Sequence, residues 1–318
     1  MDNQGPPPTA CKFTPHNPIA KRSIPSVLRP SLFSTLALGL LAHSPIQLHA
    51  ASVVIASQNP DHYFTFDGNT TDTGNSATLA TASLAGSSSV GGGSLLLSGT
   101  GNSLSVDGSG DSEVQINNDP ATINGAATDN RTISFAFNAT TITTTRSVLY
   151  EHGGATRGMA LYVEEVGGED RLYMAVWNIA ESNWGNPPVS VFTAISEGTT
   201  YHAAFVLDGD PDGDDNTDDG NVFGYLNGIQ FDSAGGAGNL RGAGNNTAFG
   251  GINENVRFHD NSTVGNGNNF NGRIDELAIW NSVLTPGQIS AQSAEFIPEP
   301  RATALGMLGA LLLLRRRR

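Results

Sequence analysis

The chain has 318 residues, and its central part, residues 52–295, contains 28 Asp and Glu against seven Arg and no Lys, a net charge of −21. A surface this acidic repels phosphate backbones and anionic lipid, which excludes nucleic acid as a partner. The same balance favours solubility and the binding of divalent cations.

The first segment of the chain has the pattern of an export leader. A basic stretch, residues 21–29, precedes an apolar stretch, residues 32–42, and the small residues Ala50 and Ala51 follow. A basic region, an apolar region and small residues in this order are typical of a secretory signal peptide. We therefore predict a signal peptide over residues 1–51, with a long basic region.

The segment after the leader has the length of one large all-β domain. The lone cysteine, Cys11, lies before it, so the exported domain has no disulfide and depends on packing and on any bound metal. We predict three parts: a signal peptide over residues 1–51, a folded domain over 52–295 and a C-terminal tail over 296–318.

Short runs of alternating apolar and polar residues recur through the domain, separated by Gly, Asn, Asp and Thr. This alternation predicts antiparallel strands. The pair Asn227-Gly228 supplies positive φ at both centres of a tight hairpin turn. The predicted strands include residues 132–137, 159–163, 172–177, 189–192 and 201–207, with weaker strands at 95–97 and 104–106.

The helical signal is confined to one place near the end of the domain. Thr285 is an N-cap, Pro286 takes the first helical position, and Gln288 follows three residues after the cap, so a capping box opens a short helix that runs to about Ser293. Many short antiparallel strands with long loops and one short C-terminal helix predict an all-β fold, a two-sheet jelly-roll sandwich.

Three segments of the domain carry a family resemblance. The first is Tyr-Phe-Thr-Phe-Asp-Gly at 63–68, the second a central hairpin at 200–228, and the third Phe-Asn-Gly-Arg-Ile-Asp-Glu-Leu-Ala-Ile-Trp-Asn at 270–281. Together they resemble laminin-G-like domains of the concanavalin A-like lectin and glucanase superfamily. The chain departs from that pattern at Tyr201, where many members have Trp, and in an Asp-rich insertion within the central hairpin.

That insertion, residues 208–220, carries the strongest chemical motif of the domain. Its acids follow the D-x-D-x-D-G order of a calcium loop, with Gly213 at the sharp turn and an acid at position 12. Crowded oxygen ligands repel one another unless a cation neutralises them. We predict a calcium site, and a solvated acidic turn is the alternative. The expected ligands are Asp208, Asp210, Asp212, Asp214, Asn216 and Asp219.

Three aromatic residues that lie close in sequence, Tyr173, Trp177 and Trp184, are candidate ligands for a sugar ring. Their rings would stack on a pyranose while neighbouring Asn side chains hydrogen-bond its hydroxyls. Tyr173 and Trp177 share one face of a predicted strand, and aromatics at alternating strand positions also build cores. The sequence leaves both alternatives open.

A search for catalytic residues finds no known motif. Asp275 and Glu276 are adjacent, so on a regular strand they face opposite sides and cannot flank one glycosidic bond. We interpret them as a structural polar pair of the last strand. If the protein is a hydrolase, its acids are expected among Glu151, Glu164, Glu165 and Asp170.

The C-terminal tail has three parts in a fixed order: a Pro-Glu-Pro tripeptide, an apolar run at 302–314 and four arginines. As a helix the run is about 20 Å long, shorter than the roughly 30 Å hydrocarbon core, and arginines stay on the cytoplasmic side. This order resembles the PEP-CTERM sorting signal of Gram-negative bacteria, which implies recognition by an exosortase. The residues concerned are Pro298, Glu299, Pro300, Arg315, Arg316, Arg317 and Arg318.

These features predict an exported, non-enzymatic binding or adhesion protein at the surface or in the matrix of a Gram-negative cell. The expected partners are an exosortase, the membrane through the C-terminal helix, and an extracellular polysaccharide or cell-surface glycan. Calcium is the expected cofactor. An exported glycan-active hydrolase is the alternative, and turnover on a panel of polysaccharides distinguishes the two.

Overall fold

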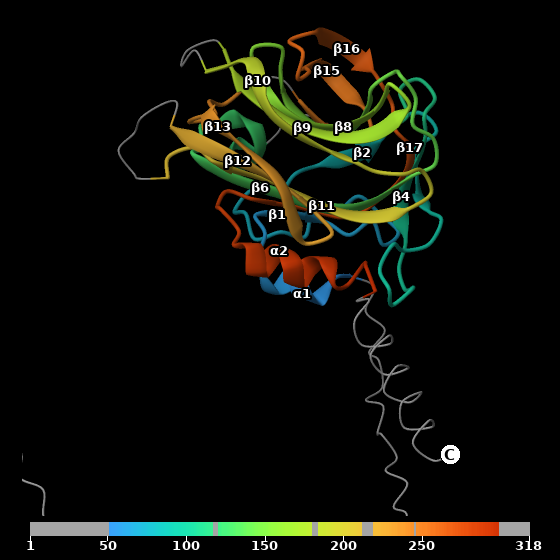
Figure 1. The fold of residues 1–318 in the computed structure, drawn as a ribbon. Coiled ribbons are helices and arrows are strands. Elements are labelled where there is room, and N and C mark those ends of the chain that lie inside the picture. Colours follow the sequence, from blue (N-terminus) through green and yellow to red (C-terminus); the bar gives the residue numbers. More distant parts are fainter. Residues whose placement is uncertain (1–50, 117–119, 180–183, 212–218, 245, 299–318) are drawn as a thin grey trace, which may run out of the picture. The chain divides into compact units, whose positions relative to one another are not determined.

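Two antiparallel sheets stacked face to face make up most of the described structure (Figure 1). The computed structural model describes residues 51–116, 120–179, 184–211, 219–244 and 246–298. All of them belong to the second of the two compact units of the chain, residues 46–318. This architecture confirms the predicted two-sheet jelly-roll sandwich.

The larger sheet has eight strands within the described residues. Seven follow one another in the order β13 (Ile229–Ala237), β12 (Gly220–Leu226), β11 (Thr200–Asp208), β6 (Asn130–Ala139), β17 (Asn271–Trp280), β4 (Ser103–Asp107) and β3 (Ser89–Gly91). The eighth strand, β1 (His62–Phe64), pairs with residues 277–279 of β17, and β4 pairs with residues 271–274. Because β6 pairs with the opposite edge, at residues 272–275 and 278–280, the last strand is held along both edges.

The smaller sheet has seven strands in the same part of the chain. Their order is β10 (Trp184–Ala194), β9 (Glu169–Asn178), β8 (Arg157–Val166), β7 (Ser147–Gly154), β14 (Thr247–Phe249), β5 (Val114–Ile116) and β2 (Ala82–Leu84). A separate hairpin, β15 (Ile252–Arg257) and β16 (Thr263–Gly267), lies over the outer face of this sheet (Figure 1).

The main core fills the space between the two sheets. On β8, Met159, Leu161 and Val163 face this core, whereas Ala160 and Tyr162 face the hairpin β15–β16 on the other side. Because successive strand residues point to opposite faces, a strand covered on both faces needs apolar residues at every position. This explains why β8 and β9 have nearly continuous apolar sequences.

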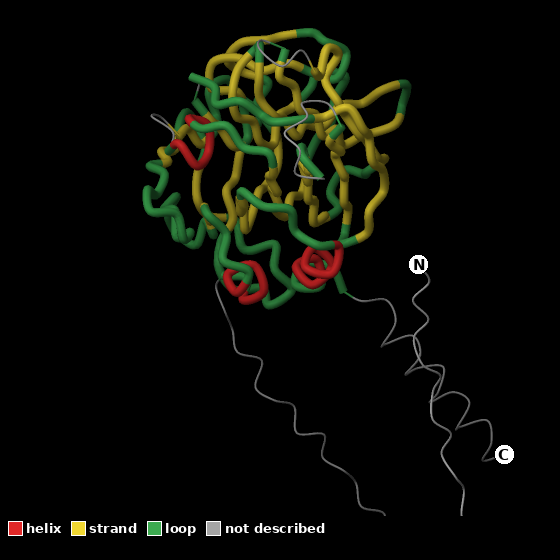
Figure 2. The backbone as a smooth tube through the Cα atoms, turned by 90° about the vertical axis from the view of Figure 1, so that its left-hand side faces the viewer, coloured by secondary structure: helices red, strands yellow, loops and turns green. Residues whose placement is uncertain are grey.

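The outer face of the larger sheet is covered by two short helices, α1 (Val53–Ser57) and α2 (Pro286–Ser293), which lie side by side (Figures 1 and 2). They come from opposite ends of the described chain. A second apolar cluster lies beneath them and contains Ile55, Trp280 and Ile289. The described structure thus has four layers: hairpin, smaller sheet, larger sheet and helix pair.

Two local predictions are confirmed in detail. The capping box of α2 is present, since the backbone N–H of Thr285 donates to Gln288 Oε1 at 2.9 Å and the N–H of Gln288 donates to Thr285 Oγ1 at 3.3 Å. Asn227 and Gly228 have φ of 52° and 76° and form the two-residue turn between β12 and β13.

Other local predictions were wrong. Residues 95–97 form a bend and a turn rather than a strand, and Leu95 and Leu96 are buried in the cluster beneath the helices. The helix α1 and a single π-helical turn, η1 (Ala121–Gly125), were not predicted. A signal for α1 existed in Ser52, whose Oγ accepts from the N–H of Ile55 at 3.0 Å as an N-cap.

Candidate functional site

A polar pocket of about 420 Å³ opens where three loops meet at one end of the sandwich. These loops follow β4, join β6 to β7, and join β16 to β17. We call it the rim pocket. Every lining residue is glycine or carries a polar side chain, so the pocket offers hydrogen-bonding groups beside the carbon atoms of the same residues. The lining residues are Asp107, Gly108, Gly110, Thr141, Thr143, Thr145, Arg146, Ser147, Gly267, Asn268, Asn269 and Asn271.

Two asparagine side chains of the rim pocket are held in place by hydrogen bonds to the protein. The Nδ2 of Asn269 donates to Oε2 of Glu113 at 2.7 Å, and the Nδ2 of Asn268 donates to the backbone carbonyl of Arg146 at 2.7 Å. Glu113 is buried and also accepts from Gln115 Nε2 at 2.7 Å, which holds its carboxylate in place. The amide nitrogens are used inside the protein, which leaves the amide oxygens to accept from a ligand.

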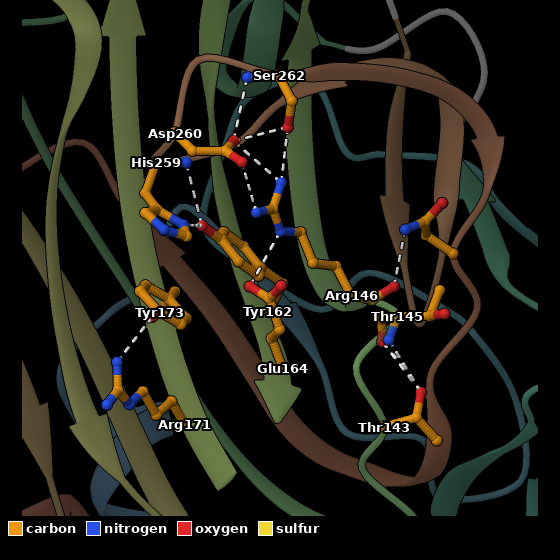
Figure 3. Close-up of polar contacts among 11 residues, drawn as sticks. Thr143, Thr145, Arg146, Tyr162, Glu164, Arg171, Tyr173, His259, Asp260 and Ser262 are labelled. Atoms are coloured by element: carbon orange, nitrogen blue, oxygen red, sulfur yellow. Dashed lines mark hydrogen bonds and ion pairs between the residues drawn. The ribbon is translucent and has the colours of Figure 1, made fainter. Parts of the chain in front are cut away.

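The other sides of the rim pocket are also ordered by local bonds. Thr143 Oγ1 donates to the carbonyl of Thr145 and accepts the N–H of Thr145, both at 3.2 Å (Figure 3). Asp107 accepts from the hydroxyls of Ser109 and Ser87, each at 2.6 Å. These hydrogen bonds, that of Ser109 first, hold the pKa of Asp107 well below its usual range, so it is an anion at neutral pH.

The side chain of Arg146 leaves the rim pocket and crosses the outer face of the smaller sheet (Figure 3). Its Nε lies 3.0 Å from Glu164 Oε2, its Nη2 lies 2.7 Å from Asp260 Oδ2, and its Nη1 donates to Ser262 Oγ at 2.6 Å. The guanidinium keeps the pKa of Asp260 well below its usual range. This Arg146 cluster ties β8 to the loop between β15 and β16.

The three candidate sugar-stacking residues do not share one surface in this structure. Tyr173 and Trp177 are 4% and 0% exposed and lie under the hairpin β15–β16, where Tyr173 stacks on His259 at 4.3 Å between ring centroids. Trp184 faces the opposite side of the sheet, in the main core. Their rings are therefore covered by protein. An aromatic that the sequence reading missed, Phe192, is 46% exposed on the same outer face as Tyr173.

The predicted calcium loop is described only at its ends. Asp208 closes β11 and Asp219 precedes β12, while Asp212, Asp214 and Asn216 lie outside the described residues. Burial, and then the charge of Asp210, raise the pKa of Asp208. In the parts of the chain that the structure describes, no three acids, histidines or cysteines are grouped so as to hold a metal ion. The calcium site stays a prediction.

The four acids proposed for a hydrolase are held in different surroundings, and none of them lines the rim pocket. Glu151 accepts from the N–H of Asn253 at 2.9 Å, and Glu164 belongs to the Arg146 cluster. Glu165 and Asp170 face each other in the β8–β9 ladder. Burial, and then Glu197 and Glu165, raise the pKa of Asp170.

The sequence-based placement of Asp275 and Glu276 on opposite faces was wrong. A bulge interrupts the β17–β6 ladder between Asp275 and Ala278, and Glu276 has φ of 54°. Ile274 and Leu277 both face the main core, so the extra residue leaves both carboxylates on the outer face, where Asp275 accepts from the N–H of Leu95 and Glu276 from that of Ser52. Alternation along a strand cannot reveal a bulge.

The predicted sorting tail lies almost entirely beyond the described chain. Pro298 is the last described residue and is exposed, whereas Glu299, Pro300 and the four arginines, with the apolar run before them, lie outside. None of the helices within the described residues has the length and apolar character needed to cross a membrane. The predicted signal peptide, residues 1–51, also lies outside the described residues except for its last residue.

Residues 107–290, more than half of the chain, match the family model of the concanavalin A-like lectin/glucanases superfamily. No curated protein matches the sequence. Similar solved structures include the botulinum neurotoxin serotype G binding domain (13% identity, TM-score 0.51, covering 74% of this chain and 50% of that one). Others are the binding domain of botulinum neurotoxin DC in complex with SialylT (12%, 0.50, 74% and 51%) and that of Paraclostridial Mosquitocidal Protein 1 (12%, 0.51, 75% and 52%). The chain spans about half the length of these domains, and the likeness shows a shared fold.

Proposed function

Because the chain belongs to the concanavalin A-like lectin/glucanases superfamily, we propose that it is a glycan-binding protein whose saccharide site is the rim pocket. The lining of this pocket carries the proposal. Saccharide hydroxyls both donate and accept hydrogen bonds, and the pocket presents amides, hydroxyls and one carboxylate at a single opening. The fold neighbours are themselves binding domains, which supports a binding role.

The side chains that line the rim pocket are also pre-organised for binding. Asn268 and Asn269 are fixed by bonds to the protein, so little side-chain freedom is lost when they bind a hydroxyl. Asp107 is charged, and the domain around it is strongly acidic. Such a field repels uronic acids and sulfated sugars, so the preferred ligands are neutral saccharides.

A calorimetric titration of the chain with neutral and acidic oligosaccharides tests this function. We expect heat of binding with a neutral saccharide and none with its acidic counterpart. Asn268→Ala combined with Asn269→Ala should abolish the signal, while Asn255→Ala, an exposed residue of β15, should leave it unchanged. Binding that survives the double substitution places the site elsewhere. Release of reducing ends by the unmodified chain would instead favour the hydrolase.

Calcium binding by residues 208–220 is a second part of the proposal. The support is the D-x-D-x-D-G order together with the raised pKa of Asp208, whose carboxylate is partly buried and lies close to Asp210. An ion bound only by the folded state stabilises it by about 2.7 kcal/mol at a hundredfold excess over Kd. Calcium should raise the melting temperature, magnesium should do so less, and Asp210→Ala with Asp212→Ala should remove the response. An unchanged melting temperature in calcium identifies a solvated acidic turn.

We also propose export followed by sorting to the cell surface or matrix. The support lies in the sequence of the two ends: a basic and apolar leader, and the tail with its tripeptide, apolar run and arginines. Changing Pro298, Glu299 and Pro300 to alanine should leave export intact but retain the protein at the inner membrane. Surface labelling of intact cells measures this, and unchanged surface display in the variant contradicts recognition by an exosortase.

A further inference from the structure

The backbone nitrogen of Ser52 lies in a buried acidic site. Its N–H is 3.0 Å from Glu276 Oε2 and 3.1 Å from the Tyr63 hydroxyl, and the same Oε2 also accepts from that hydroxyl. The side chain of Ser52 donates to Glu295 Oε2. Ser52, Tyr63 and Glu276 are each at most 3% exposed. One peptide N–H is therefore shared between two buried acceptors.

This site groups acidic side chains, and no cation is among the charged groups that act most on Glu276. Glu276 Oε1 is buried and has no hydrogen-bond partner among the described residues. The charged groups that act on Glu276 from β17 and from the loop after β1 are Asp275 and Asp67, both acidic. Burial, and then Asp275, raise the pKa of Glu276 to about 9, and burial likewise raises that of Tyr63. The carboxyl is thus held as a neutral acid for lack of a cation.

Removal of the predicted leader would place a cation, the α-ammonium group of Ser52, in this site. The predicted signal peptide ends at Ala51, so hydrolysis of the Ala51–Ser52 peptide bond adds water across it and gives a carboxylate on Ala51 and an amine on Ser52. That amine is the same nitrogen that already faces Glu276. Once protonated, it has three N–H donors in place of one, which suffice for the Tyr63 hydroxyl and both oxygens of Glu276.

We propose that Glu276 and Tyr63 form a receptor for the new α-ammonium group of Ser52, so that removal of the leader completes the fold. The site lies at the start of α1 and includes Glu276 of the last strand, β17. It links two residues that are 224 positions apart in the sequence. In the uncleaved chain the site binds only a peptide N–H. Cleavage converts an uncompensated acid into an ion pair, and the mature chain is more stable than its precursor. This inference is independent of glycan binding.

The chain offers a specific chemical probe for this amine. Its two lysines, Lys12 and Lys21, both lie in the leader, so a chain beginning at Ser52 has its α-amine as the sole primary amine. An amine-reactive ester therefore labels that group alone. An ion pair that raises the amine pKa by one unit lowers the reactive fraction about tenfold at neutral pH. Burial slows the reaction further.

The test compares residues 52–318 with residues 51–318, each released from a fusion without extra residues. We expect the Ser52 amine to be labelled at least about tenfold more slowly in the folded chain than in urea, and the Ala51 amine to show little protection. Glu276→Gln should remove the protection. Glu295→Gln is the matched control and should keep most of it, because the Glu295 carboxylate accepts from the Ser52 hydroxyl and the N–H of Val54 and not from the Ser52 nitrogen.

Two results would overturn the proposal. One is equal labelling of the folded and unfolded Ser52 chain, which shows that the amine is not bound. The other is a mature protein, purified after export, whose first residue by mass spectrometry is not Ser52. If Glu276→Gln does not fold, the comparison of the 52–318 and 51–318 chains still decides, because it requires no substitution.

Discussion

The two outer faces of the sandwich are both covered, but the acids on them lie in different electrostatic surroundings. Over the smaller sheet, the hairpin β15–β16 places Asp260 near Arg146, which also pairs with Glu164. Over the larger sheet, the helix pair encloses Asp275 and Glu276, and the charges acting on them are acidic. The acids over the smaller sheet thus have a cation within hydrogen-bond distance, whereas the raised pKa of Glu276 keeps that carboxyl protonated at neutral pH.

This difference shows that a segment can cover the face of a sheet without placing an opposite charge near the charged side chains on that face. The hairpin follows soon after its own sheet in the sequence, and the loop between its strands provides Asp260. The helix pair joins the first and last described segments, so its charge depends on how the chain begins. The pKa shifts have opposite directions: hydrogen bonds from Arg146 lower the pKa of Asp260, whereas burial and then Asp275 raise that of Glu276.

The largest expected effect on stability comes from replacing the buried tryptophan beneath the hairpin β15–β16 or the one beneath the helix pair. Trp177 under the hairpin and Trp280 under the helices are both buried, with Nε1 donating to the carbonyls of Gly154 at 2.8 Å and Gln58 at 3.0 Å. Each Trp→Ala change should lower the free energy of unfolding by about 3–5 kcal/mol. Urea unfolding measures it, with the half-exposed Phe192→Ala as control. A Trp177→Ala effect as small as that of the control contradicts a firmly packed hairpin.

The second prediction is that Glu276 on one face and Asp260 on the other change the free energy of unfolding with pH in opposite directions. In a chain extended before Ser52, the raised pKa of Glu276 means that the folded state holds its proton more tightly, so stability falls from about pH 5 upward. The lowered pKa of Asp260 contributes stability above about pH 4 that is lost on acidification.

A chain that begins at Ser52 should behave differently at high pH. Its ammonium has a raised folded pKa, so the stabilisation is complete below about pH 7.7 and is lost as the pH rises through that folded value. Urea unfolding from pH 3 to pH 10 on both chains measures these windows. Identical profiles for the two chains contradict the amine receptor while leaving the Asp260 assignment intact.

The third prediction exchanges the charged groups themselves. Arg146→Met removes the cation shared by Glu164 and Asp260, so it should cost about 2 kcal/mol of stability. Glu276→Gln in the extended chain removes an acid that is already protonated, so it should be neutral or slightly stabilising near pH 7. Both are measured by thermal and urea unfolding. Equal destabilisation by the two changes shows that the faces do not differ in charge compensation.

The smallest expected effect concerns the rim pocket, which borders the hairpin side. Asn269→Ala alone removes one fixed acceptor and should weaken saccharide binding by about 1 kcal/mol, roughly fivefold. Glu276→Gln lies on the opposite face and should leave the affinity unchanged. Isothermal titration at one pH and salt concentration measures both. A loss of affinity on Glu276→Gln shows that the two faces are coupled.

The sequence by itself determined the elements that depend on near neighbours. The strand pattern over 172–177 predicted β9, Asn227-Gly228 predicted the hairpin turn, and the capping box of Thr285 and Gln288 predicted α2. Each of these signals acts within a few residues, so the chain elsewhere does not alter it. The family resemblance at the last strand also followed from a contiguous segment, and the family match includes it.

Tertiary structure alone decided which surfaces are exposed and which groups meet. The hairpin β15–β16 buries Tyr173 and Trp177, and a bulge places Asp275 and Glu276 on one face; alternation along a single strand contains neither fact. The rim pocket joins loops more than 100 residues apart, and Ser52 reaches Glu276 across 224 positions. Strand pairing creates these contacts, and their chemistry depends on burial, which the local sequence does not encode.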